Sequence, residues 1–446
     1  MDLVTNSVEK NGISYPQDFY IKKLQFTTSS GSIDFEKLLI QFSYYEDIFS
    51  FVTSGHLTVV DAQGFIEILQ LDGNEFLEIE YAKNKNGPTN SGTFRVYKIG
   101  DRVPGDNPNT SLYTLYFCSE ELLLSEQNKI TKTYVGTKIS DLVKNILNIL
   151  QVPSQKIYNI EETTGIYDFT IPRFKPFEAI SWLSTYARPK ASGTKGADML
   201  FFENKDGYNF RSIKSMLSAE SIGTYKYQLN NIESADMAEK VFTVLQYEFV
   251  KTQDMLENIN SGMIANKLIS IDPFKKSFTT TNFNVNQDET NIGGLKNRLG
   301  KTQTQSYDSV VKVAVSNSGQ KEVPYIKEVE GSVAQDIFIE TYVPNRTSQI
   351  NLANYITVKM TVPGNPMLTA GRTINFNLLT QRNSSNNTQK DLDAFYSGKY
   401  LITAVRHTIS AEGKYITVLE IVKEKTENKY SNNNSNSSTW KSVVKA

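Results

Sequence analysis

Residues 44–64 read YYEDIFSFVTSGHLTVVDAQG, and the second half of this stretch predicts a β-strand. Polar and apolar side chains alternate there, which places His56 and Thr58 on one face of the strand and Leu57 and Val59 on the other. Such alternation is typical of a strand with one face buried and the other in water. The stretch therefore indicates a sheet, and the DAQG that ends it indicates a turn.

The same stretch contains side chains that acid–base catalysis uses, namely Glu46, Asp47, His56 and Asp61. The alternation assigns them to strand faces and turns. Asp61 and Gly64 bound the DAQG turn, where an Asx side chain and a flexible backbone are favoured. The residues alone therefore favour a structural role for this stretch.

Short strand-like runs continue on both sides, separated by small and Asx residues. They predict a first all-β domain at residues 1–125. The runs are IKKLQF, IDFEKLLIQFSYYEDIF, GHLTVVDA, FLEIEYA, GTFRVYKIGD and TSLYTLYFCS.

The period of the apolar residues then changes, which predicts an α+β domain at residues 126–232. KISDLVKNILNIL, residues 138–150, has one apolar helical stripe, with Thr137 or Ser140 available as its N-cap. KPFEAISWLSTYA, residues 175–187, has proline in its first turn. MLFFEN and YNFRSI follow as a hairpin with an Asp-Gly turn.

Residues 233–335 mix strand-like runs, KVFTVLQYEFV and KKSFTTTNFNV, with polar stretches and predict a loop-rich excursion. A second all-β domain is predicted at residues 336–425 from the runs IFIETYV, ITVKMTVP, GRTINFNLL, KYLITAVRHTI and KYITVLEIVK. A short helix, NRTSQINLAN, is expected between the first two runs. The Asn/Ser-rich residues 426–446 should order only against a partner. The predicted fold is mixed and mainly β.

The 47 basic and 48 acidic residues nearly cancel. This balance argues against a protein that grips nucleic acid or an anionic membrane. Cys118 is the single cysteine, so no intramolecular disulfide can form, and the N-terminal residues lack the apolar stretch of a signal peptide. No run approaches the roughly 18 apolar residues that a membrane span requires. We expect synthesis in a cytoplasm and no membrane insertion.

Motifs of catalysis are incomplete in this sequence. GGLKNRLGKT, residues 293–302, resembles a phosphate-binding loop, but Gly294 lies one residue too far from Gly300 and a poor helix follows. His56 and His407 are the two histidines, which are too few for most zinc sites, and both fall in alternating strand patterns. We therefore predict no metal and no cofactor.

Pairs of carboxylates are the remaining route to catalysis, since glycoside hydrolysis needs only two. None of the pairs is singled out by its spacing, and Cys118 ends an apolar strand where a thiol is most often inert. We predict that the chain is not an enzyme. The candidate pairs are Glu46 with Asp61, Asp72 with Glu75, and Glu161 with Glu162.

Three stretches read together resemble the baseplate hub protein of contractile-tailed bacteriophages, which is related to the hub portion of VgrG-type spikes. Residues 44–81 are similar to the first barrel of that family, with its Glu-Asp-Ile-Phe segment and D-x-x-G turn. Residues 171–216, with a Pro-led helix before a Phe-Phe-Glu-Asn strand, look like its middle domain. Residues 361–425 resemble the closing strands of its second barrel, with a V-x-G-x-P-x-L-x-x-G turn and a G-x-Y-L-I-x-x-V-x-H hairpin.

The resemblance implies two tail-tube-like β-barrels that flank the insert and the excursion, so that a homotrimer forms a pseudo-sixfold ring. Such a ring in the virion joins the sixfold tail tube to the threefold central spike, with tape-measure or other baseplate proteins as further neighbours. DNA passes through its bore without specific binding. The family-like turns of this sequence contain Asp61, Gly64, Gly364, Pro366, Gly371 and Gly398.

We expect the bore to carry more Asp and Glu than Lys and Arg, because counterion release holds DNA on basic surfaces. A function of another class stays open as well. The chain would then be a carbohydrate-active or carbohydrate-binding β-protein, such as a cell-wall-degrading tail component, whose tyrosines stack on sugars.

Overall fold

The computed structural model describes residues 15–29, 31–65, 68, 73–105, 110–191, 197–227, 237–252, 254–273, 276–284, 309–315, 339–353, 356–379, 392–393 and 395–423. The predicted mixed, mainly β fold is confirmed. The GGLKNRLGKT stretch and the Asn/Ser-rich tail both lie outside these residues.

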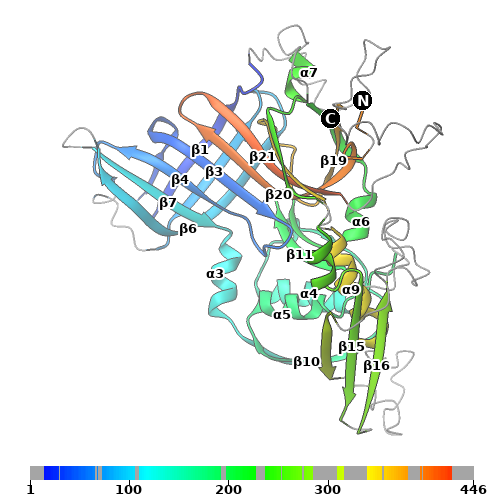
Figure 1. Cartoon of the computed structure of the whole chain (residues 1–446). Coiled ribbons are helices and arrows are strands. Elements are labelled where there is room, and N and C mark those ends of the chain that lie inside the picture. Colours follow the sequence, from blue (N-terminus) through cyan, green and yellow to red (C-terminus); the bar gives the residue numbers. More distant parts are fainter. Residues whose placement is uncertain are drawn as a thin grey trace, which may run out of the picture.

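One sheet of thirteen strands dominates the described part of the chain (Figure 1). Its strands run in the order β14-β18-β21-β20-β3-β4-β7-β6-β5-β1-β2, and β19 also pairs with β20 and in turn with β13. The strands are β1 (Tyr20–Thr28), β2 (Gly31–Asp34), β3 (Leu39–Asp47), β4 (Ser54–Asp61), β5 (Phe76–Ala82), β6 (Thr89–Pro104), β7 (Ser111–Cys118), β13 (Ser221–Tyr227), β14 (Gln246–Lys251), β18 (Ile356–Pro363), β19 (Thr373–Leu378), β20 (Gly398–Ser410) and β21 (Lys414–Lys423).

The two predicted β-regions are parts of this single sheet. Strand β3 of the first region pairs antiparallel with β20 of the second, with Tyr45 opposite Arg406. The hydrophobic cores also cross between the two regions. Ile409 and Tyr415 of the second region lie in the core of the first region, and Ile48 of the first region lies in the core of the second. Among the described strands, the pairings end at β2 and β14 and close neither half into a barrel.

The middle of the chain forms an α+β unit below the large sheet (Figure 1). Its main helices and its hairpin, β11 with β12, are where the sequence predicts them. Its elements are α3 (Glu120–Gln127), β8 (Ile130–Thr137), α4 (Ile139–Ile149), β9 (Ile157–Ile160), β10 (Tyr167–Phe174), α5 (Pro176–Ser184), β11 (Met199–Asn204), β12 (Gly207–Ser212) and α6 (Ile213–Ser218); 3-10 turns lie at Glu36–Leu38 and Ser154–Lys156.

The predicted cap of α4 is wrong. Lys138 occupies the N-cap position, and its side chain does not accept a hydrogen bond from an N–H group of the helix. Instead the N–H of Ser140 donates to Oγ1 of Thr163 at 3.0 Å, so the hydroxyl group comes from a distant segment. A tertiary contact thus replaces the local cap.

The segment 337–343, IFIETYV, is predicted as a strand. This prediction is wrong for residues 339–343, and residues 337 and 338 lie outside the described part of the chain. From Ile339 onwards it belongs to helix α9 (Ile339–Ala353), which also contains residues 345–353 of the expected NRTSQINLAN helix. The side chains of Ile339 and Tyr342 are one helical turn apart and pack together with Leu268 of a neighbouring strand. This apolar contact outweighs the β-propensity of the segment.

Strands also lie within the predicted excursion. Strand β14, in that range, and β13, in the α+β range, pair with β18 and β19 of the large sheet. The division of the chain into five domains stays a prediction. The remaining elements are α7 (Met237–Val241), α8 (Met255–Asn260), β15 (Ala265–Asp272), β16 (Ser277–Asn284) and β17 (Val311–Val315). No helix in the described part of the chain is long and apolar enough to cross a membrane.

Candidate functional site

Residues 364–371, GNPMLTAG, connect β18 to β19 and are buried except for the half-buried Met367; we call them the 364–371 loop. Gly364 donates its N–H to the carbonyl of Tyr415 at 2.8 Å, and a Cβ at position 364 would lie 2.0 Å from Cγ of Tyr415. Pro366 lies in the turn that Leu368 closes by donating to the carbonyl of Asn365 at 3.1 Å. The loop is therefore pressed against the sheet.

Glu46, at the inner face of β3, holds the far end of this loop. Its carboxylate accepts the hydroxyl of Thr369 at 2.5 Å and the N–H of Ala370 at 2.8 Å, and it also accepts the N–H of Lys205 at 2.8 Å. The side chain is 2% exposed. Burial raises the pKa of Glu46 to about 7, because desolvation of the charge outweighs the donors, which lower it.

His407, on β20, holds the middle of the same loop. Its Nε2 lies 3.0 Å from the carbonyl of Leu368, which can only accept, so this nitrogen carries the proton. Nδ1 then accepts from the hydroxyls of Tyr415 at 2.8 Å and Thr417 at 3.2 Å. Burial lowers the pKa of His407 to about 4, so this histidine is a neutral structural group at neutral pH.

Three consecutive residues at the tip of hairpin β11–β12 connect the parts of the chain. The carboxylate of Glu203 accepts the N–H of Thr53 at 2.9 Å, at the start of β4. The Nδ2 of Asn204 donates to the carbonyl of Ala370 at 2.9 Å. Lys205 donates its N–H to Glu46. The hairpin therefore joins the first β-region, the 364–371 loop and the α+β unit.

The carboxylate of Glu203 belongs to a second buried polar cluster. It also accepts the hydroxyl of Ser119 at 2.5 Å, and its other oxygen lies 3.4 Å from Nζ of Lys156. Lys156 bonds Glu121 at 2.8 Å, so one ammonium lies between two carboxylates. Burial raises the pKa of Glu203. These contacts tie α3 and β11 to the end of β7.

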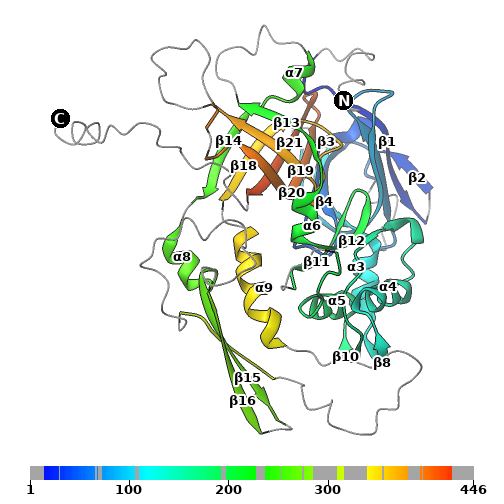
Figure 2. The same cartoon turned by 90° about the vertical axis from the view of Figure 1, so that its right-hand side faces the viewer.

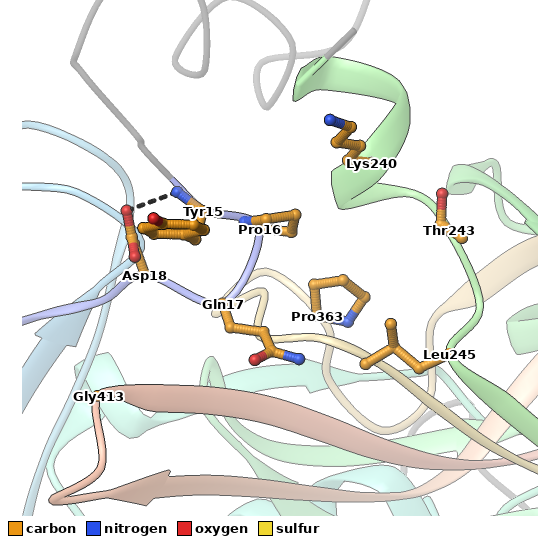
Figure 3. A pocket seen from close by; sticks show the side chains of 9 residues that line it. All are labelled: Tyr15, Pro16, Gln17, Asp18, Lys240, Thr243, Leu245, Pro363 and Gly413. Atoms are coloured by element: carbon orange, nitrogen blue, oxygen red, sulfur yellow. Dashed lines mark hydrogen bonds between the residues drawn. The ribbon is translucent and has the colours of Figure 1, made fainter. Parts of the chain in front are cut away.

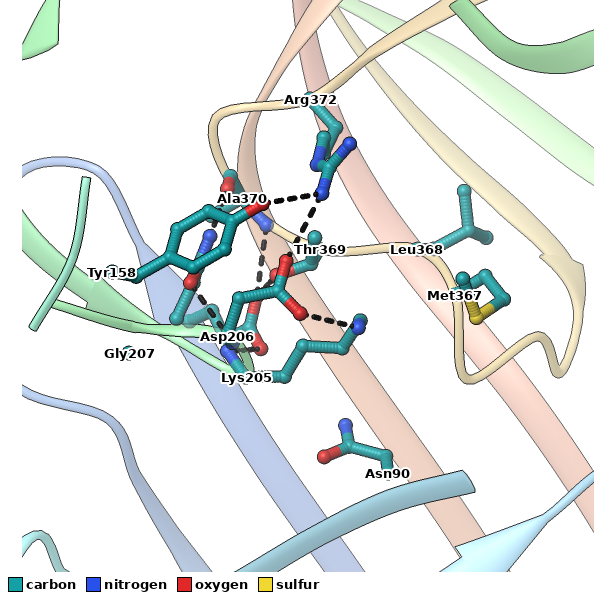
Figure 4. A network of polar contacts seen from close by, with 12 residues as sticks. Asn90, Tyr158, Lys205, Asp206, Gly207, Met367, Leu368, Thr369, Ala370 and Arg372 are labelled. Carbon is teal, nitrogen blue, oxygen red and sulfur yellow. Dashed lines mark hydrogen bonds and ion pairs between the residues drawn. The ribbon is translucent and has the colours of Figure 1, made fainter. Parts of the chain in front are cut away.

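The rim of the site consists of three charged side chains (Figure 4): Lys205 and Asp206 are mostly buried, and Arg372 is 40% exposed. Asp206 accepts from Nζ of Lys205 at 2.7 Å and from Nη2 of Arg372 at 3.2 Å. The same Arg372 nitrogen donates to the hydroxyl of Tyr158 at 3.1 Å. Figure 4 shows these side chains gathered over the 364–371 loop. The rim thus adds an ionic connection from β9 and the hairpin to the loop.

The polar groups of this site are bonded to one another, so the site holds the fold together; we call this set of contacts around Glu46 and His407 the structural lock. Each oxygen of Glu46 receives donors from the protein itself, and both ring nitrogens of His407 are bonded. A general acid or base needs a face open to a substrate. The geometry instead holds three parts of the chain in one fixed arrangement.

No protein-family model matches the sequence, and no curated protein matches it. Among solved structures, the chain is similar to the tail protein from Neisseria meningitidis MC58, with a TM-score of 0.52, 10% identity, and coverage of 91% of this chain and 97% of that one. It is also similar to the 43 kDa tail protein of prophage MuSo2 from Shewanella oneidensis, with a TM-score of 0.51, 9% identity, and coverage of 90% and 98%. The chain has the fold of these tail proteins. The resemblance found in the sequence is confirmed for the fold.

Within this tail-protein fold, the family-like turn residues lie at bends of the chain. The carboxylate of Asp61 accepts the N–H groups of Gln63, Gly64 and Phe65 at 2.8, 2.9 and 2.7 Å. Gly64 has a φ of +71°. This is the geometry of an Asx turn.

Two more of these glycines have a positive φ, which residues other than glycine rarely adopt. Gly371 has a φ of +81°, and a Cβ there would lie 2.7 Å from the ring of Phe202. Gly398 has a φ of +134°, and a Cβ there would lie 2.9 Å from Nζ of Lys423. Both positions exclude ordinary side chains.

The acid pairs proposed from the sequence have separate partners in the tail-protein fold. The carboxylate of Glu46 accepts hydrogen bonds from the 364–371 loop, whereas the carboxylate of Asp61 accepts hydrogen bonds from its own turn. Glu161 accepts from Ser212, and Glu162 pairs with Lys138 and Lys190. Glu75 accepts the N–H of Gly73, and Asp72 lies outside the described residues.

The remaining candidates are also part of the fold. His56 is half-buried, and its Nδ1 lies 3.3 Å from the hydroxyl of Tyr45. Cys118 is buried, and burial raises the pKa of its thiol to about 11. In the described ranges, no group of three or more His, Cys, Asp or Glu side chains could hold a metal ion.

The role of Glu46 was missed by the sequence reasoning, although a signal exists. Phe42, Tyr44 and Glu46 alternate along β3, and all three are buried. A carboxylate in register with two buried aromatic residues faces the core and requires internal donors. The donors themselves lie more than 150 positions away and give no local signal.

A pocket of about 320 Å³ lies elsewhere on the fold, where the first described residues cross the β20–β21 turn (Figure 3). Pro16, Leu245 and Pro363 give it an apolar wall, and Lys240 lies at its edge. Asp18, the one carboxylate among the described residues that line it, accepts the N–H of Tyr15 at 2.9 Å. Within the part of the chain that the structure describes, the lining has no pair of acids and no histidine.

Proposed function

We propose that the chain is the structural hub of a contractile phage-tail baseplate. Three copies form a pseudo-sixfold ring that joins the sixfold tail tube to the threefold central spike and leaves a channel for DNA. The observation that carries the proposal is the likeness of 91% of this chain to 97% of a tail protein. The resemblance of residues 44–81, 171–216 and 361–425 to hub proteins supports it independently.

The connections between the β-regions and the α+β unit suit a protein that transmits force between tube and spike. The two β-regions form one hydrogen-bonded sheet through β3 and β20. Buried polar contacts through Glu46 and Glu203 connect that sheet to the α+β unit. Relative motion of these parts would break buried hydrogen bonds without replacement, so the hub would move as one body.

We also propose that the chain acts without catalysis, in the virion, after synthesis in the host cytoplasm. Its partners would be two further copies, the tail tube protein, the central spike, and tape-measure or neighbouring baseplate proteins. The Asn/Ser-rich tail would contact one of these chains. The carbohydrate alternative needs exposed aromatic side chains. Tyr81, Tyr113, Tyr208 and Tyr225 are fully buried and cannot serve, whereas Tyr15, Tyr20, Tyr97 and Tyr158 are exposed, so the glycan-binding assay below decides between the two functions.

We propose further that the solvent face of the large sheet lines the channel. One row of cross-strand neighbours on that face runs Glu248, Lys359, Glu420, Ala404 and Asp47, across β14, β18, β21, β20 and β3. Three acids and one base lie in this row. An acidic row repels phosphates, which suits a surface along which DNA must slide.

The hub proposal predicts a homotrimer in solution. The purified full chain should form a trimer by native mass spectrometry, with three times its 50.3 kDa chain mass when it is alone and with the mass of the spike added when the spike protein of the same phage is bound. Hydrolysis of peptidoglycan or binding to common glycans should be absent. A chain that stays monomeric at all concentrations, also with the spike present, would contradict the hub.

Reversal of charge in the proposed channel row should make the ring hold DNA. The double variant Glu248→Lys/Glu420→Lys adds six lysines to a trimer, and we expect DNA affinity at low salt to rise roughly tenfold or more and to fall steeply with added salt. Fluorescence anisotropy with labelled duplex DNA measures this. The matched control is Glu220→Lys/Glu412→Lys, which changes the same charge at two other exposed positions. An equal rise in the control would refute the assignment of this face to the channel.

A further inference from the structure

Strands β16, β15 and β17 form a separate sheet with two unlike faces. On the inner face, Leu268 of β15 packs with Ile339 and Tyr342 of α9, and Ala314 of β17 packs against the same cluster. Nζ of Lys312 donates to the hydroxyl of Thr347 on α9 at 2.6 Å. This face is part of the body of the molecule.

The outer face of the sheet is exposed. It is apolar along β17, at the end of β15 and at Phe278, whereas Thr280 and Asn282 of β16 are polar. The register places Ile269 beside Val313 and Ile271 beside Val315 on β17, and Ile271 also beside Phe278 on β16. The exposed fractions are 64% for Val313, 69% for Val315 and 76% for Phe278. None of the outward-facing residues on the three strands is acidic, and Lys267 is the one basic residue. We call this surface the outer face of β15–β17.

We propose that the outer face of β15–β17 is covered by a second copy of this chain in the assembled ring. The inference rests on the proposed hub function and adds to it a surface of contact between neighbouring copies.

The composition of the face fits a permanent contact. Interfaces between subunits that assemble once and stay together are more apolar than transient ones, which have the average composition of a protein surface. Val311, Val313, Val315, Ile271 and Phe278 are all at least 43% exposed in the single chain. A second copy is present wherever the chain is made, so it can cover these side chains at all times.

The size of the face argues against a small separate partner. Three strands of five to eight residues present roughly 300 Å² on one face, from the usual spacings within and between strands. A stable contact needs about 800 Å² on each partner. The outer face therefore supplies only part of an interface, and a neighbouring copy in a ring can contact other surfaces of the chain at the same time.

The position of the sheet also favours a neighbour. Both views show β15 and β16 extending from α9 away from the large sheet (Figures 1 and 2). Within the described strands, β16 and β17 are the two edges, and each pairs only with β15. A sheet that projects from the body and exposes apolar residues is placed to reach the next subunit.

The test compares the mass of three forms of the full chain by native mass spectrometry over a range of concentrations. We expect Val313→Lys/Val315→Lys to raise the concentration at which the trimer dissociates by about a hundredfold or more, because two ammonium groups would be buried against apolar atoms. Val135→Lys is the control, since Val135 is a strand valine on β8 that is 71% exposed. It should leave the trimer unchanged, and both variants should keep the circular dichroism spectrum of the wild type.

A second measurement identifies the occupant. Benzoylphenylalanine at position 313 is photoactivated in trimers mixed from ¹⁴N-labelled and ¹⁵N-labelled chains, and cross-linked peptides are analysed by mass spectrometry. Cross-links that join light and heavy chains support the proposal. Cross-links within one chain only, or in assembled particles to a different tail protein only, overturn it.

The outcomes separate this inference from the hub function. If the wild type is trimeric and Val313→Lys/Val315→Lys trimerises as tightly, the outer face of β15–β17 is not a contact between copies. The proposed hub function would still stand in that case. A wild type that is monomeric even with its spike overturns both.

Discussion

Replacing Glu46 with alanine should lower the free energy of unfolding at neutral pH by about 3 kcal/mol. The substitution leaves the N–H groups of Lys205 and Ala370 and the hydroxyl of Thr369 without their acceptor. All three donors lie where the hairpin β11–β12 and the 364–371 loop meet β3. Each buried donor without a partner costs about 1 kcal/mol or more, so the loss exceeds that of a surface substitution several times.

Urea unfolding followed by circular dichroism measures this loss. Thr369→Val removes one donor with little change in shape and should cost about 1 kcal/mol. Glu248→Ala removes an exposed glutamate from β14 and should change the free energy of unfolding by less than about 0.5 kcal/mol. If Glu46→Ala lowered the free energy of unfolding no more than Glu248→Ala does, the hydrogen bonds around Glu46 would not stabilise the protein in solution.

The pKa of Glu46 adds a pH dependence to this comparison. The folded pKa of about 7 lies above the ordinary value of 4.5, so the folded chain takes up a proton that the unfolded chain still lacks between these values. The part of the Glu46 contribution that comes from proton uptake is therefore fully present below pH 4.5 and is lost as the pH rises through 7. The difference between wild type and Glu46→Ala should grow by up to about 3 kcal/mol from pH 8 to pH 5.

His407 shifts in the opposite direction and must be separated from this effect. Its folded pKa of about 4 lies below the ordinary 6.5, so its contribution is present above pH 6.5 and is lost as the pH falls toward 4. Both the wild type and Glu46→Ala carry His407, so its effect cancels in their difference. A difference that is flat, or that shrinks as the pH falls, would contradict the raised pKa of Glu46.

Gly364→Ala should lower the free energy of unfolding by about 3 kcal/mol or more, because the site has no room for a methyl group. The new Cβ would lie 2.0 Å from Cγ of Tyr415. The ring of Tyr415 cannot withdraw, because its hydroxyl bonds His407 and its ring packs at right angles to the ring of Tyr81, with the centroids 5.7 Å apart. Chain and ring would have to separate, and the 364–371 loop would lose its contact with the sheet.

Gly413→Ala is the matched control, since a Cβ there meets nothing within 4 Å although φ is +76°. We expect it to cost about 1 kcal/mol from backbone strain alone. A double-mutant cycle with Tyr415→Ala isolates the overlap: once the ring is gone, Gly364→Ala should cost little more. Equal costs of Gly364→Ala with and without the ring would show that the clash is not the cause.

The sequence by itself determined the elements whose cause is local. Alternation placed His56 and His407 in strands because neighbouring side chains of a strand face opposite sides. Apolar residues at helical spacing predicted α4, and a proline at the first turn predicted α5. The Asp-Gly pair predicted the β11–β12 hairpin. Each of these signals spans only a few neighbouring residues.

Tertiary structure alone decided what depends on contacts between distant residues. Residues 339–343 are helical because Ile339 and Tyr342 pack against Leu268, although their composition favours a strand. Thr163 supplies the hydroxyl at the start of α4 that neither Thr137 nor Ser140 provides. In both places a contact across the fold outweighed a local preference.

The joining of the two β-regions and the role of Glu46 have the same origin. Nothing near β3 in the sequence indicates that it pairs with β20, some 360 residues later. Alternation could place Glu46 on the inner face of its strand, but the hairpin N–H and the 364–371 loop that bind it come from the far parts of the chain. The sequence determined which side chains face inward, and the packing of distant segments determined what they meet there, because hydrogen bonds form between groups that are close in space.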